Sequence, residues 1–197
     1  MTASPVRSVV GVQTASARKV RIGERLILTA IHKTAASGPL GVQALGLDGD
    51  EQADLSVHGG LDKAVYAYPS EHYGFWREQR AQAGVAGLDD ALPWGSMGEN
   101  LSLQGLLEVD VWVGDCLRFP HCTLRVTQPR EPCYKFNAAM GFNQAVKAMA
   151  QSGRCGFYLA VDVPGTISAG ESFELVPGSR QVSIRERFAA KVFKHLR

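Results

Sequence analysis

The chain has 197 residues, 45% of them hydrophobic and 20% charged, and a net charge of +2 at pH 7. This length suits one globular domain with a small appendage at most. The low net charge and the lack of a basic run interleaved with aromatic residues argue against a nucleic-acid-binding protein. No apolar stretch approaches the roughly 18 to 20 residues of a membrane span. The first residues lack the apolar segment of a secretory signal, so we expect a cytoplasmic protein.

The N-terminal third reads as strands. The segments VRSVVGVQ (6–13) and ERLILTAIHK (24–33) are rich in β-branched and apolar residues. A glycine followed by an acidic residue recurs at 23–24, 114–115 and 170–171, each time before an alternating run. This pattern is typical of tight turns that open strands. The sequence therefore predicts a β-dominated fold of the α+β class with flanking helices, built around a barrel or sandwich.

Helices are predicted at three places. Residues 69–83 begin with Pro-Ser and run into a glycine, and residues 132–151 form two short helical pieces separated by Gly141. Residues 182–197 form an amphipathic helix with a basic outer face, which we interpret as a peripheral helix packed on the barrel. A docking or membrane-surface role for this helix is the alternative. The segment 84–98 is predicted to be an irregular loop that helps to shape the rim of a site.

The four cysteines lie at 116, 122, 133 and 155. They contain no C-x-x-C pair, so their spacing does not favour a zinc site, and a reducing cytosol does not favour disulfides. Cys116 and Cys122 stand in alternating segments and are expected to be structural. Cys155 fits either a second functional thiol or a core residue.

Cys133 has a different setting, in the stretch TQPREPCYKF (127–136). Arg130 precedes it and Lys135 follows it, and nearby positive charge favours an ionised thiol. Pro132 suits the first turn of a helix, which would place the thiol near a helix N-terminus. The alternative is that the two cations form only a solvated loop face.

Three other short segments carry residues suited to ligand binding. The run His58-Gly59-Gly60 is followed by Lys63, and paired glycines let a backbone approach an anion closely. Asn100, in GENL, offers a donor and an acceptor to a heterocycle. Two chemistries remain open at this point. The Cys133 thiolate could act as a nucleophile with a histidine partner such as His58, or as a soft metal ligand beside an anionic cofactor.

The segments VHGGLDKAVYAYPSEHYGFW, GENL, VTQPREPCYKFN and SGRCGFYLAV occur in this order along the chain. Together they resemble the MOSC family, named for the C-terminal domain of molybdenum cofactor sulfurase. They are most similar to the branch of bacterial proteins that confer resistance to 6-N-hydroxylaminopurine. The resemblance covers roughly residues 25–178.

This resemblance implies a MOSC-type β-barrel that binds the molybdenum cofactor (molybdopterin), with Cys133 as the molybdenum ligand and catalytic residue. The implied activity is the reduction of N-hydroxylated bases or related N-oxygenated compounds, a detoxification. The cofactor-binding residues expected on this basis are His58, Gly59, Gly60, Lys63, Glu99, Asn100, Arg130, Lys135 and Arg154. Asn100 and the 84–98 loop would also help to select the substrate.

The resemblance also implies the domain organisation. Residues 1–178 would form the barrel domain, and residues 179–197 a basic helix left from the longer helical extension of some relatives. The sequence has no cysteine pattern for an iron–sulfur domain, so electrons would come from a separate reductase. Two alternatives stay open: a non-catalytic carrier of the cofactor, or of sulfur on Cys133, and a metal-free enzyme with a cysteine nucleophile.

Overall fold

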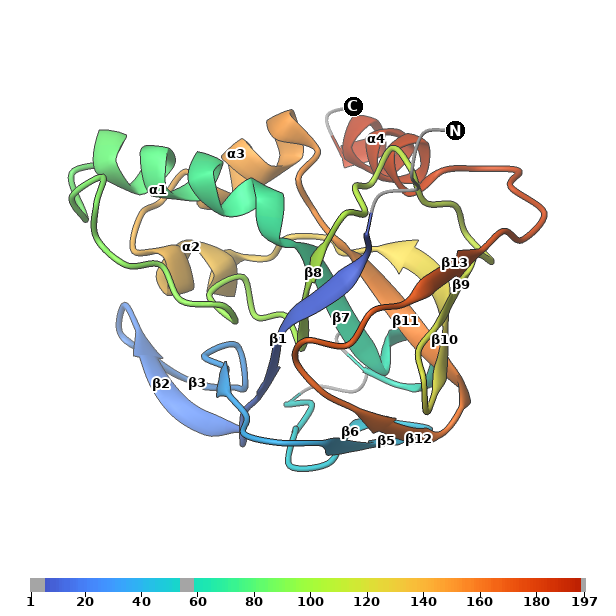
Figure 1. Ribbon diagram of the computed structural model, residues 1–197. Helices are drawn as coiled ribbons and strands as arrows, with labels where there is room; N and C mark the ends of the chain where they lie inside the picture. Colours follow the sequence, from blue (N-terminus) through green and yellow to red (C-terminus); the bar gives the residue numbers. More distant parts are fainter. Residues whose placement is uncertain (1–5, 54–58, 196–197) are drawn as a thin grey trace.

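The computed structural model describes residues 6–53 and 59–195. Thirteen strands and six helical segments follow one another along this part of the chain (Figure 1). The strands are β1 (Ser8–Thr14), β2 (Arg18–Ile22), β3 (Arg25–Thr29), β4 (Thr34–Ala35), β5 (Leu40–Gln43), β6 (Gly46–Leu47), β7 (Val65–Pro69), β8 (Leu101–Gln104), β9 (Cys116–Arg118), β10 (Thr123–Pro129), β11 (Phe157–Val163), β12 (Gly165–Ile167) and β13 (Glu174–Val176). The 3-10 turns are η1 (Leu61–Lys63) and η2 (Ser70–His72), and the α-helices are α1 (Tyr73–Gln82), α2 (Tyr134–Met140), α3 (Ala145–Ser152) and α4 (Ile184–His195).

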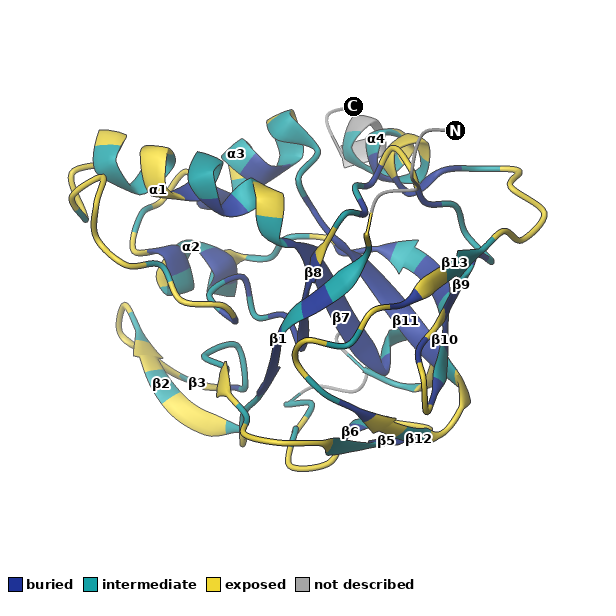
Figure 2. Cartoon of the chain, in the orientation of Figure 1, coloured by how far each residue is buried: buried dark blue, intermediate teal, exposed yellow. Residues whose placement is uncertain are grey.

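Eight strands form the main sheet, in the order β13-β9-β10-β11-β7-β8-β1-β4. Neighbours pair antiparallel except β7 and β8, which run parallel. Strand β7 is buried along its whole length, as is most of β11, because both lie in the middle of the sheet between other layers (Figure 2). This explains why their sequences, VYAYP and FYLAVDV, are nearly continuous apolar and aromatic runs.

The closed barrel expected from the sequence is not found among the described strands. The sheet curls so that β1 approaches the turn before β13, but the two segments share only an isolated bridge between Ser8 and Ser172 and a few backbone hydrogen bonds, such as the bond from Val9 N to Glu171 O at 2.9 Å. The edge strand β13 begins only at Glu174, after this contact. The β-dominated prediction is therefore confirmed, and its closure into a full barrel is wrong.

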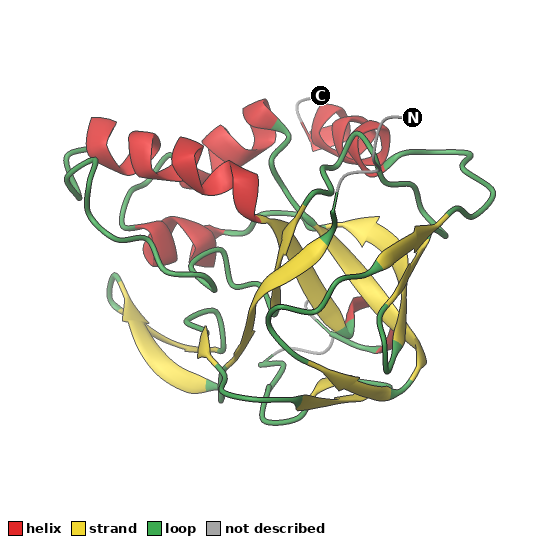
Figure 3. Ribbon diagram, viewed as in Figure 1, coloured by secondary structure: helices red, strands yellow, loops and turns green. Residues whose placement is uncertain are grey.

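The helices gather beside the sheet, with α1, α2 and α3 grouped together and α4 apart from them (Figure 3). The prediction for 132–151 is confirmed, since α2 and α3 end at Gly141 and Gly153, both with a left-handed backbone (φ of 82° and 71°). Trp76 of α1 and Phe136 of α2 are fully buried against each other. Burial of one such aromatic side chain stabilises the fold by roughly 1.5–3 kcal/mol.

Helix α4 packs its apolar stripe inward. Ile184 and Phe188 are buried, and Ser183 and Glu186 form a capping box in which each side chain bonds to the other's backbone N–H. An ion pair joins Lys191 to Glu131, which stands two residues before Cys133. These contacts support the interpretation of α4 as a peripheral helix. Of the helices in the described residues, none has the length and apolar content needed to cross a membrane.

Candidate functional site

A cavity opens between the hairpin β2–β3, the segment after β6 and the start of α2. It holds about 670 Å³ of empty space, the solvent at its mouth included. The expected site residues that line it are Lys63, Asn100, Arg130, Cys133 and Lys135. These five residues come from three separate segments of the chain, which the fold brings to one place.

Arg130 is the central cation of this cavity. It follows β10 and is 5% exposed. Its guanidinium carbon lies 5.3 Å from the centre of the Tyr66 ring and 4.8 Å from that of Phe136, and Nη1 lies 3.4 Å from Met149 Sδ. No carboxylate among residues 6–53 and 59–195 forms an ion pair with it. A buried charge without a counter-ion is costly, so this arrangement fits an anionic ligand.

Cys133 lies directly before α2 with an extended backbone and is half-buried. It lines the main cavity and also a second one, of about 550 Å³ on the same measure. Lys63 and Tyr158 are shared by both cavities as well. The Cys133 sulfur therefore stands where two cavities meet. This thiol is therefore reachable from the cavities and is not part of the packed core.

Two lysines add positive charge around Cys133. Lys63 Nζ lies 5.8 Å from the centre of the Tyr158 ring, within the range of a cation–π contact. Lys135 Nζ donates a hydrogen bond of 3.3 Å to the carbonyl of Leu28, which links α2 to the β2–β3 hairpin across the cavity wall. With Arg130, the cavity therefore carries three cations around one sulfur.

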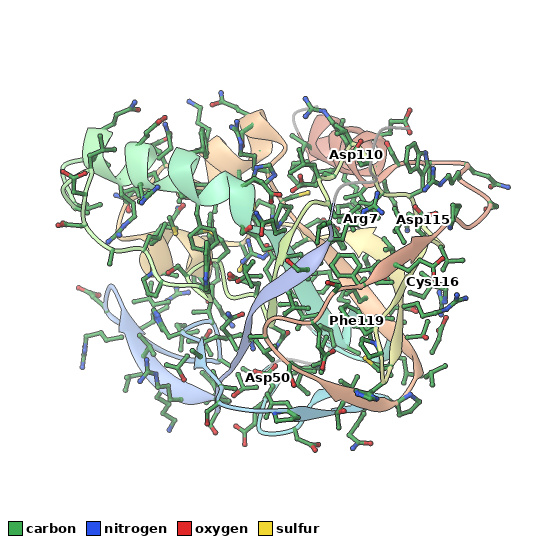
Figure 4. The ribbon with its side chains drawn as sticks, in the orientation of Figure 1. Arg7, Asp50, Asp110, Asp115, Cys116 and Phe119 are labelled. Carbon is green, nitrogen blue, oxygen red and sulfur yellow. The ribbon has the colours of Figure 1, made fainter. Side chains whose placement is uncertain are left out.

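Asn100 lines the cavity, but its side chain is already engaged. Its Oδ1 accepts a hydrogen bond from Tyr66 N (3.1 Å), while Nδ2 donates to Gln13 O (3.2 Å) and Asp50 Oδ2 (2.8 Å). Asp50, labelled in Figure 4, in turn pairs with Lys33 and accepts a hydrogen bond from the backbone N–H of Ala15, directly after β1. Burial lowers the pKa of Lys33, while Asp50 opposes this shift. Asn100 thus builds the cavity wall, and its expected role in selecting the substrate is not supported.

Glu99 lies outside the cavity, contrary to the expected cofactor contact. It is fully buried and accepts hydrogen bonds from Gly95 N (2.8 Å), Met97 N (3.0 Å), Ser102 Oγ (2.8 Å) and the Tyr73 hydroxyl. Burial raises its pKa, and the hydrogen bonds oppose that shift. The carboxyl group therefore fixes the end of the 84–98 loop. Of this loop only Gly98 lines the cavity, so the loop's part in the site is smaller than expected.

Arg154 is also displaced from the expected site. Its guanidinium carbon lies 4.2 Å from the centre of the Phe75 ring on α1, and it lines neither cavity beside Cys133. Its carbonyl accepts a hydrogen bond from the Tyr68 hydroxyl at 3.1 Å. The neighbouring Cys155 is fully buried, and burial raises the pKa of its thiol well above the usual value. Cys155 is therefore a core residue.

The glycine pair forms the turn that leads into η1. Gly60 has a positive φ of 86°, its carbonyl accepts a hydrogen bond from Lys63 N (3.0 Å), and its N–H donates to Gln52 Oε1 (3.1 Å). Gly59 and Gly60 do not line the cavity, and His58 lies outside the described residues. The turn at these glycines thus positions Lys63 in the cavity wall. The expected contact of Gly59 and Gly60 with a cofactor stays a prediction.

Sequence reasoning missed part of the wall. Asp50, Gln52, Tyr66 and Tyr158 all line the main cavity. The polar run of residues 48–54, DGDEQAD, was a signal that this segment bears functional or structural polar groups. No group of three or more His, Cys, Asp or Glu side chains suited to a metal occurs within the described ranges.

Comparison with known proteins identifies the family, since residues 54–174 match the MOSC domain. The chain belongs to the MOSC domain family. It is 39% identical over 168 residues to Protein YiiM of Escherichia coli (strain K12), which covers 85% of this chain and 72% of that protein. The crystal structure of YiiM from Geobacillus stearothermophilus superposes with a TM-score of 0.75 at 30% identity, covering 95% of this chain and 85% of that one. A Gibberella moniliformis protein named "Reductase" is 33% identical over 151 residues, which span 76% of this MOSC chain but 26% of that protein.

Proposed function

We propose that this chain binds the molybdenum cofactor in the main cavity and reduces N-hydroxylated bases or related N-oxygenated compounds. The observation that carries the proposal is Arg130, a buried guanidinium that lines the cavity without a carboxylate partner among the described residues. MOSC membership and the reductase name of one relative support redox chemistry.

The donor set fits such a cofactor. Arg130, Lys63 and Lys135 are cations of the kind that bind a phosphate and other anionic oxygens, and Arg130 can do so with two parallel N–H groups. The Cys133 thiolate is a soft ligand suited to molybdenum. When bound, the cofactor would supply the two-electron reduction of the substrate. The protein would hold it, exclude water and orient the substrate.

We place the substrate in the second cavity. Its wall includes Gln128, whose side-chain amide has no hydrogen bond within the described part of the chain, and Tyr158, which lines this cavity together with Cys133. An amide donates and accepts, as recognition of a base edge requires, and an aromatic ring offers a stacking face. The common boundary at Cys133 would put a base in this cavity next to the metal.

The test is to purify the protein from a host that makes the cofactor and to measure molybdenum, pterin and reduction of an N-hydroxylated purine by reduced viologen. We expect bound molybdenum and turnover for the wild type. Cys133→Ala should lose molybdenum and activity, whereas Cys116→Ala, a matched half-buried thiol on β9, should keep both. Molybdenum without turnover would identify a carrier. Turnover without molybdenum would show a metal-free cysteine enzyme and would refute the proposal.

A further inference from the structure

The β2–β3 hairpin has an exposed outer face. In its register Lys19 lies opposite Leu28 and Arg21 opposite Leu26, and cross-strand neighbours share a face of the ribbon. These four side chains, the outer face of the hairpin, are all exposed. On the other face Val20 and Ile27 are half-buried, and Thr29 is buried. The hairpin therefore turns one face to the body of the protein and the other to solvent (Figure 2).

The outer face combines exposed leucines with cations. Leu26 is 62% exposed and Leu28 46%. Residues 18–25 carry four cations and one acid, Glu24, a net charge of +3 that exceeds the +2 of the entire chain. None of these four cations forms an ion pair with a described carboxylate. Apolar anchors surrounded by like charge are typical of a surface that binds a partner of opposite charge.

The hairpin also forms one wall of the main cavity. Strand β3 ends at Thr29, and Thr29 and the next two residues, Ala30 and Ile31, line the cavity. The bond from Lys135 Nζ to the Leu28 carbonyl ties the hairpin to the helix that follows Cys133. A protein seated on the hairpin would therefore stand at the rim of the site.

We propose that the outer face of the hairpin docks a small acidic electron-carrier protein. This inference rests on the proposed function, because converting N–OH to N–H with release of water consumes two electrons and two protons, which a separate donor must supply. A second copy of this chain is disfavoured as the occupant, since a two-fold contact would bring the cations of one hairpin against those of the other. An acidic carrier meets the cations with opposite charge and covers the two leucines.

The test compares two electron donors on the cofactor-loaded protein. One is an acidic flavodoxin kept reduced by NADPH and its reductase, and the other is reduced viologen. The double variant Lys19→Glu/Arg21→Glu should raise the KM for flavodoxin tenfold or more at low salt and leave viologen-driven turnover unchanged. Leu26→Ser/Leu28→Ser should weaken flavodoxin turnover in the same selective way. The matched control is Arg77→Glu/Lys147→Glu, an equal charge change at two exposed cations on α1 and α3, which should alter neither rate.

An NMR titration of cofactor-free protein with flavodoxin gives a second readout, in which we expect salt-sensitive shifts in residues 18–29. Equal flavodoxin kinetics and shifts in the hairpin variants and the wild type would overturn the docking proposal. If the wild type is a dimer and these substitutions convert it to a monomer, the hairpin serves self-association and the docking proposal is wrong. If the protein sediments with anionic vesicles and the hairpin substitutions abolish this, the hairpin binds a membrane and the docking proposal is also wrong. Absence of viologen turnover in the wild type would refute the proposed function, and the titration would still report on docking.

Discussion

Replacement of Arg130 by methionine separates ligand binding from stability. Methionine has a similar length and can occupy the space between the Tyr66 and Phe136 rings that the guanidinium fills. If the arginine serves an anionic ligand, its removal should not harm the ligand-free fold. If it serves the fold, the variant should be unstable.

The magnitude follows from two opposing contributions. Removing an unpaired buried charge relieves a desolvation cost of several kcal/mol, and exchange of buried charges for apolar groups is neutral or stabilising by roughly 1–4 kcal/mol. Loss of two cation–π contacts costs about 1–2 kcal/mol each. At their midpoints these two contributions nearly cancel, so we expect the free energy of unfolding of Arg130→Met to lie within about 2 kcal/mol of the wild-type value. Loss of charged hydrogen bonds worth roughly 1.5–3 kcal/mol should weaken phosphate binding about 10- to 150-fold.

Urea unfolding of cofactor-free protein over a range of phosphate concentrations measures both quantities, because a ligand that binds only the folded state raises its stability. The wild type should gain stability with phosphate, and Arg130→Met should not. Arg77→Met, the same change at an exposed arginine on α1, should retain the phosphate response. A loss of more than about 2 kcal/mol in Arg130→Met would show that Arg130 is a structural residue and would refute the reasoning.

Three other predictions concern residues away from the ligand. Burial raises the pKa of Glu99, so the folded protein favours its protonated form. The contribution of Glu99 to the free energy of unfolding should therefore be fully present below pH 4.5 and be lost as the pH rises through the raised pKa, and Glu99→Gln should remove this contribution in urea titrations at several pH values. Gly156→Ala should lower the free energy of unfolding by about 2–4 kcal/mol, because φ is 64° and the new Cβ would lie 2.5 Å from Ala67 O; a loss below 1 kcal/mol would contradict this. Iodoacetamide at pH 8 should modify Cys133 but spare Cys122, whose burial raises the pKa of its thiol to about 12, and mass spectrometry would reveal a failure.

Local patterns predicted the helical part of the fold well. Gly141 and Gly153 end α2 and α3 where expected, because a left-handed backbone at a helix end is a local property of glycine. Closure of the barrel was not predictable in this way. It depends on whether Ser8 and its neighbours pair fully with a segment near Ser172, and no local pattern specifies how two such distant segments meet.

In the candidate site, too, local sequence patterns predicted some residues, whereas contacts between distant segments decided the others. The sequence singled out Cys133, Arg130 and Lys135, which line one cavity in the structure, because charge and thiol stand within a few residues of one another. It did not predict that Glu99 lies away from the cavity, because a polar residue beside a strand can point to either side of the backbone, and the inner side here holds the Tyr73 hydroxyl. It missed Asp50 because that carboxyl group acts through Asn100, fifty residues away.

The bonds that connect Asn100 to Gln13, Tyr66 and Asp50 have a consequence for how the protein is made. Every partner of this side chain belongs to the protein, so the wall it builds exists before any ligand arrives. Its partners are also far apart in sequence, so the wall forms only once most of the sheet has assembled. Under the proposed function, maturation would be a two-stage process in which a finished apoprotein receives the cofactor, and a host deficient in that cofactor should still accumulate folded apoprotein that can be loaded afterwards.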